Sequence, residues 1–130
     1  MRVLVVMVLL LFPWPAVAQT PASAAWRATP ASLLKTTLRA VAAGQARYRA
    51  EHPTYASSTA QLNVRPEDGI RVEILTASSE GWQAKAVHPA QPGRSCVIFA
   101  GQLDHAEFPR TDGDREMAGE EGVPLCDRMR

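Results

Sequence analysis

The three histidines of the chain are its most direct candidates for metal chemistry, because imidazole is the commonest protein ligand of metal ions. His52, His88 and His105 lie far apart in the sequence. None belongs to an H-x-x-x-H or H-E-x-x-H pattern, the spacings that bring two imidazoles to one ion. We therefore interpret them as separate surface or strand-end residues and expect no metal site built on them.

An acidic triplet near the C-terminus offers a second kind of metal site. The spacing of Asp112, Asp114 and Glu116 matches the first three oxygen ligands of a calcium loop. The sixth and twelfth positions would be Met117 and Val123, where such a loop needs glycine and glutamate. The sequence favours a solvated acidic loop, with calcium binding as the alternative, and we expect no cofactor.

The chain contains serine and cysteine, the residue types of covalent catalysis, but not the sequence motifs in which they usually act. Ser95 is not in a G-x-S-x-G elbow, and strand alternation would turn its side chain away from that of Cys96. No C-x-x-C motif supports a redox role. Tyr48, Tyr55 and Trp82 have the spacing of core aromatics rather than that of a binding platform. We predict that the chain is not an enzyme.

The first 18 residues, MRVLVVMVLLLFPWPAVA, have the order of a cleaved export signal. Arg2 precedes an apolar run, and Ala16-Val17-Ala18 forms a cleavage site. The apolar run is about half of the roughly 20 residues that span a bilayer. We expect cleavage after Ala18 and a mature protein that is periplasmic or secreted, without an integral membrane segment.

Export places the cysteines in an oxidising compartment, where pairing is their usual fate. Cys96 and Cys126 are the only cysteines of the chain and should form one disulfide. Closing a loop of about 30 residues would contribute roughly 3 to 4 kcal/mol in the chain-entropy model. That is a large share of the stability of a small domain.

Length and charge limit the kind of domain that the chain can form once the export signal is removed. Residues 19–29 form a leader rich in small residues, and residues 30–130 can bury one core. The chain has 14 basic and 13 acidic residues, and the two numbers become equal when Arg2 leaves with the signal. This balance excludes the basic excess that nucleic acids or anionic membranes attract.

The longest predicted element is an amphipathic helix over residues 30–51. Thr29 is a good N-cap, Pro30 suits the first turn, and Pro53 stops the helix. One stripe of side chains recurs at alternating spacings of four and three residues, and we expect it to face the core. The stripe comprises Leu34, Leu38, Val41, Gln45 and Tyr48.

Three later stretches alternate along the chain as strands do. The residues that share a strand face are Ile70, Val72 and Ile74; Trp82, Ala84, Ala86 and His88; and Cys96, Ile98 and Ala100. Short turns at 78–81 and 89–94 join the strands into an antiparallel meander. Because the helix is the only other regular element, we expect it to cover this sheet in a two-layer α+β fold.

Residues 102–123, which we call the acidic segment, contain seven acidic side chains and few apolar ones. The segment cannot bury enough apolar surface to fold alone. We predict a long surface loop that Cys126 ties back to the domain. Its candidate contact residues are Asp104, Asp112, Asp114 and Glu116.

A series of short motifs runs through the domain. It comprises Gln45-x-x-Tyr48, Tyr55 within RYRAEHPTYAS, Leu62, a strand led by Gly69, Gly81-Trp82, Ala84-x-Ala86-x-His88 and Ser95-Cys96-Val97-Ile98. Together these motifs resemble the globular head of type IV pilin-like and pseudopilin-like proteins over about residues 34–127. The resemblance implies a helix lying across an antiparallel meander, and a disulfide that pins an exposed, variable loop.

The N-terminal part of the chain departs from that family. Pilins begin with a short basic leader and an apolar helix that carries a glutamate near its start. This helix anchors the subunit and builds the filament. Here no acidic residue precedes Glu51, and the apolar run ends in prolines. The resemblance therefore implies a pilin-like head without the prepilin anchor helix, which would not form a pilus fibre on its own.

Two classes of function fit these observations. The first is an exported structural or interaction module that contacts a protein of the cell envelope, in a pilus or secretion assembly. The alternative is a small periplasmic ligand-binding or inhibitor domain with its site between helix and sheet. A filled core behind Trp82 would favour the first, and an apolar pocket of several hundred Å³ the second.

Overall fold

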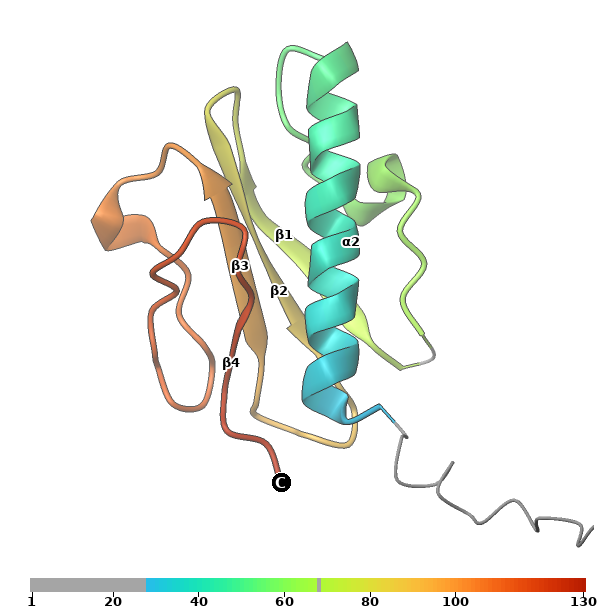
Figure 1. The fold of residues 1–130 in the computed structure, drawn as a ribbon, viewed down its shortest axis with the longest axis vertical. Helices are drawn as coiled ribbons and strands as arrows, with labels where there is room; N and C mark the ends of the chain where they lie inside the picture. Colours follow the sequence, from blue (N-terminus) through green and yellow to red (C-terminus); the bar gives the residue numbers. More distant parts are fainter. Residues whose placement is uncertain (1–27, 68) are drawn as a thin grey trace, which may run out of the picture.

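The computed structural model describes residues 28–67 and 69–130. The expected export signal and nearly all of the expected leader lie outside these residues. Figure 1 shows one long helix lying along an antiparallel sheet. In chain order the elements are α2 (Pro30–Glu51), η1 (Thr59–Leu62), β1 (Arg71–Ala77), β2 (Gly81–Val87), β3 (Cys96–Gly101), η2 (His105–Glu107) and β4 (Leu125–Cys126). The predicted α+β class, with one helix on an antiparallel sheet, is confirmed.

Helix α2 has the predicted bounds. The Thr29 hydroxyl accepts a hydrogen bond from the Ser32 amide at 3.2 Å and so caps the N-terminus. Pro30 occupies the first turn, and the backbone becomes extended at His52, directly before Pro53. Within the two described stretches, no helix has the length and apolar character needed to cross a membrane.

The stripe on α2 packs against the sheet. Leu34, Leu38 and Val41 are fully buried, whereas Tyr48 is half-buried at the end of the stripe. The sheet contributes Trp82, which is only 2 % exposed, and its neighbours on the same face. Those neighbours are Ala84, Ala86, Cys96 and Ile98, with Val72 and Ile74 partly buried beside them, and Ile70, directly before β1, is buried in the same core. Helix and sheet therefore meet over a packed apolar core.

Within residues 28–67 and 69–130 the sheet has four strands, where the sequence predicts three. β1, β2 and β3 pair as the predicted meander, and β4 adds two residues beyond β3. Two residues are too few to show an alternating pattern, so β4 has no sequence signal of its own. In this added pairing Cys96 lies directly opposite Cys126.

Polar members of the helix stripe hold the connection from α2 to β1. The buried Gln45 side chain donates to the Ala56 carbonyl and accepts from the Ala56 amide, both at 2.8 Å. The Tyr48 hydroxyl accepts a hydrogen bond from the Gln61 side chain at 3.1 Å. Because a buried polar group without a partner is costly, Gln45 stabilises this connection by satisfying both backbone groups of the buried Ala56.

The second face of the sheet is covered as well, which corrects the expectation that the helix is the only cover. Val97 and Phe99 of β3 are buried on this face beneath the acidic segment. Figure 1 shows that segment in orange and red on the side of the sheet away from α2. The apolar residues that pack there are Leu103, Phe108, Ala118 and Leu125. The domain therefore has three layers at β3.

Candidate interaction site

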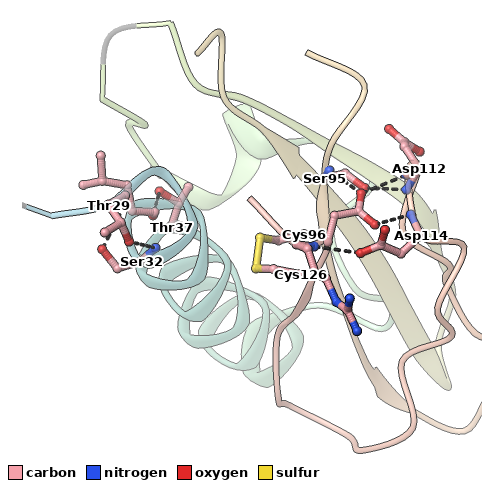
Figure 2. Close-up of a disulfide and its surroundings, with 12 residues drawn as sticks. Thr29, Ser32, Thr37, Ser95, Cys96, Asp112, Asp114 and Cys126 are labelled. Atoms are coloured by element: carbon pink, nitrogen blue, oxygen red, sulfur yellow. Dashed lines mark hydrogen bonds between the residues drawn. A yellow bond between two sulfur atoms is a disulfide. The ribbon is translucent and has the colours of Figure 1, made fainter. Parts of the chain in front are cut away.

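Cys96 and Cys126 form the predicted disulfide across a sequence separation of 30 residues. Cys96 is fully buried and Cys126 is half-buried, and both belong to the helix-side core. In Figure 2, dashed lines join Ser95, Asp112 and Asp114 to hydrogen-bond partners on one side of the yellow sulfur bridge. The bond fixes β4 beside β3 and thereby fixes the far end of the acidic segment.

The residue that follows the second cysteine is the main polar anchor of the segment. Asp127 is only 3 % exposed. Its carboxylate accepts hydrogen bonds from the backbone amides of Ser95 at 2.8 Å, Gly113 at 2.8 Å and Asp114 at 2.6 Å. Buried backbone amides need an acceptor, and hydrogen bonds to a charged group are stronger than neutral ones. Asp127 therefore ties the middle of the acidic segment to the start of β3.

The same hydrogen bonds determine the charge state of Asp127. Burial acts to raise the pKa of its carboxyl. Hydrogen bonds from the Thr111 side chain and from the backbone amides of Asp114, Gly113 and Ser95 outweigh burial and hold the pKa below its usual value. Asp127 is therefore an ionised buried anchor at neutral pH.

This lowered pKa predicts an acid-sensitive contribution to stability. Because the folded-state pKa of Asp127 is depressed, its contribution is full above the unfolded-state value of about 4 and is lost as the pH falls through the folded-state pKa. We expect the difference in unfolding free energy between the wild type and Asp127→Asn to shrink between pH 6 and pH 2.5. Urea unfolding at both pH values measures this difference. An equal difference at both would contradict the assigned charge state.

Asp112 and Asp114, two of the predicted contact residues, hold the segment onto the domain. Lys85 Nζ lies 3.3 Å from Asp112 Oδ1, and Arg94 Nη1 lies 2.8 Å from Asp114 Oδ1. The other carboxylate oxygen of Asp114 accepts a hydrogen bond from the Arg128 amide at 2.7 Å. Such partly exposed ion pairs each contribute about 1 kcal/mol or less, so they orient the segment more than they stabilise it.

The side chains of the other two predicted contact residues have no partner in the described part of the domain. Asp104 and Glu116 are exposed, and their side chains form no hydrogen bond or ion pair with any residue that the structure describes. The same holds for Glu120. These three carboxylates are therefore available for contacts outside the domain.

The acidic segment is more ordered than the predicted surface loop. Arg110 and Met117 form an isolated antiparallel bridge, and the Thr111 amide donates to the Glu116 carbonyl at 2.9 Å. Phe108 stacks on Phe99 of β3 with ring centroids 4.2 Å apart. The segment therefore folds back on itself and packs against the sheet.

The remaining candidates are dispersed over the domain. His52 stacks on Tyr48 with ring centroids 3.8 Å apart, while Ser95 is buried and its hydroxyl accepts from the Asp112 amide at 2.8 Å. Within residues 28–67 and 69–130, no three His, Cys, Asp or Glu side chains lie close enough together to hold a metal ion. Ser95 thus has a structural role.

Sequence reasoning missed the two residues that organise the site, Asp127 and Arg94. Their partners lie 13 to 32 residues away along the chain, so no local pattern reveals them. The one local signal is a charged residue directly after a cysteine that is expected to form a disulfide. A buried charge needs partners, and backbone amides of a glycine-containing turn can supply them.

Neither models of known protein families nor curated proteins match this chain.

Proposed function

We propose that this chain is an exported, non-enzymatic interaction module with a pilin-like head, whose acidic segment binds a protein of the cell envelope. The observation that carries the proposal is the way in which this segment is attached to the domain. The disulfide and the buried Asp127 carboxylate hold it to the domain, while Asp104, Glu116 and Glu120 are exposed. A surface held in place before binding loses little conformational entropy on binding, which favours affinity.

The charge of the segment defines the partner surface that would fit it. Its seven acidic side chains stand against only two basic ones, Arg110 and Arg115. A complementary partner presents lysine or arginine side chains, and the attraction speeds association and weakens as salt is added. We therefore propose a basic protein surface, in an envelope, pilus or secretion assembly, as the binding partner.

Several features support the pilin-like and exported parts of the proposal. α2 lies across an antiparallel meander, and a disulfide bounds the acidic segment, as the resemblance implies. Gln45 and Tyr48, which belong to the resembling motif, hold the connection between α2 and η1. A structural disulfide is also typical of proteins that work in an oxidising compartment.

The packed core favours an interaction module over the alternative of a ligand-binding domain. Trp82 is 2 % exposed and shares its core with Leu34, Leu38 and Val41, which are fully buried. A ligand between helix and sheet would have to displace these side chains. Two hollows beside α2, of about 410 and 540 Å³, are lined by the helix and by residues of the 61–67 stretch, and no strand residue lines either of them.

The test is recovery of the partner by the exported protein and by a charge-reduced variant. The protein is tagged at its C-terminus, and its intact mass shows whether it begins at Gln19. The variant Asp104→Asn/Glu116→Gln/Glu120→Gln should recover about tenfold less partner from an envelope extract, because three exposed charge contacts are lost without a change in the anchors. Quantitative mass spectrometry of the bound proteins measures the recovery.

The matched control removes three exposed carboxylates elsewhere, through Glu51→Gln/Glu67→Gln/Glu73→Gln. This control should recover as much partner as the wild type does. Equal losses in the two variants would show that only net charge matters, and full recovery by the first variant would exclude the acidic segment as the contact surface.

A further inference from the structure

The two cysteines lie next to the residues that fasten the acidic segment. Ser95 precedes Cys96, and Asp127 follows Cys126. The Asp127 amide donates to the Ser95 carbonyl at 2.9 Å, and the Ser95 amide donates to the Asp127 carboxylate at 2.8 Å. The disulfide and these two hydrogen bonds therefore act together to hold the two-residue strand β4 beside β3.

The middle of the acidic segment is hydrogen-bonded to the same two residues, Ser95 and Asp127. The amides of Gly113 and Asp114 donate to Asp127, and the Asp112 amide donates to the Ser95 hydroxyl at 2.8 Å. Because one turn bonds both residues, the turn can form all three bonds only while Ser95 and Asp127 stay side by side. The disulfide keeps them so, because it joins their immediate neighbours in the chain.

The apolar contacts beneath the segment are few compared with those beneath α2. Among the described residues, three buried apolar side chains, Val97, Phe99 and Ala118, form the core on this face, whereas eleven form the core on the helix side. Parts of a protein with few buried apolar contacts open at a lower free energy than its main core does. We therefore expect the acidic segment to open before the main core does when the disulfide is broken.

We propose that the acidic segment is a redox-sensitive strap, released from the sheet when the Cys96–Cys126 disulfide is reduced. Release exposes Val97 and Phe99 to solvent and frees the 112–114 turn from Asp127. α2 and strands β1 to β3 stay folded, because their core does not include the segment. This regulation goes beyond the proposed binding function and does not depend on it.

The releasing step is a thiol–disulfide exchange with a dithiol reductant. A thiolate of the reductant attacks the sulfur of the half-buried Cys126, the sulfur–sulfur bond breaks, and Cys96 leaves as a thiolate that takes up a proton. The second thiol of the reductant then attacks the mixed disulfide and releases Cys126 as a thiol. Two electrons pass to the cysteine pair, and the reductant becomes a disulfide.

Amide hydrogen exchange of the purified protein, with and without dithiothreitol, tests the proposal. In the oxidised protein the amides of Gly113, Asp114 and Gly122 should be protected, since each donates to an acceptor in the domain. Reduction should speed their exchange at least about tenfold, while the amides of Leu38 and Val41 in α2 keep their protection. The double variant Cys96→Ala/Cys126→Ala should show the reduced pattern without any reductant.

Two results would overturn the proposal. Unchanged protection at Gly113 and Asp114 after reduction, with both thiols confirmed by alkylation, would show that Asp127 holds the segment without the disulfide. Equal loss of protection in the segment and in α2 would show that the disulfide stabilises the whole domain and releases no strap.

Discussion

Replacing Asp127 by alanine is expected to lower the free energy of unfolding by about 3 to 5 kcal/mol, because three backbone amides lose a buried charged acceptor at once. Each hydrogen bond to a charged group contributes about 1.5 to 3 kcal/mol, and their effects do not add fully because water reaches part of the site. Urea unfolding at pH 7, followed by tryptophan fluorescence, to which the buried Trp82 contributes, measures the loss.

The matched control for this prediction is Asp104→Ala. It removes an exposed carboxylate of the acidic segment that has no partner among the described residues, so stability should change by no more than about 0.5 kcal/mol. Asp127→Asn should fall between the two, because its amide oxygen still accepts hydrogen bonds without the charge. A loss below 1 kcal/mol for Asp127→Ala would refute its role as the anchor.

The substitution Leu38→Ala should cost about 2 to 5 kcal/mol, the range measured for buried leucines. Leu38 lies in the middle of the α2 stripe and is fully buried against the sheet, so its removal leaves a cavity in the main core. Thermal and urea unfolding of the purified variant both report this loss.

The neighbouring substitution Arg39→Ala is the control, because Arg39 lies on the exposed side of α2. Its effect should be about 0.5 kcal/mol or less. Similar losses for the two variants would mean that α2 does not pack on the sheet through this stripe.

The helix and the meander could be predicted because their signals are local. Thr29, Pro30 and Pro53 mark the ends of α2, and the spacing of the stripe shows which side is buried. Alternation in the strands likewise identifies the face that carries Trp82 and Ile98. Each of these signals is contained within a few turns or one strand of the chain.

The cover on the second face could not be predicted, because the acidic segment is stabilised by contacts that are distant in sequence. Its composition is typical of a solvated loop, and only a few apolar residues, such as Phe108 and Ala118, reach the sheet. Part of its attachment is polar, and the partners of Asp127, which are Ser95, Gly113 and Asp114, follow no sequence pattern.

The candidate contact residues illustrate the same limit. Sequence alone treats Asp104, Asp112, Asp114 and Glu116 as equivalent members of one acidic stretch. The structure separates them, since Asp112 and Asp114 pair with Lys85 and Arg94 while the other two have exposed carboxylates. Only three-dimensional contacts distinguish a carboxylate that anchors the segment from one that is free to bind.

Site-specific photo-crosslinking in cells that export the protein tests the proposed contact surface most directly. A photoreactive residue is placed at position 104 or 116 on the acidic segment, or at position 39 on the exposed side of α2. We predict that positions 104 and 116 give a covalent adduct with the same protein partner and that position 39 gives none. Adducts from position 39 alone would contradict the proposal and place the interaction on the helix.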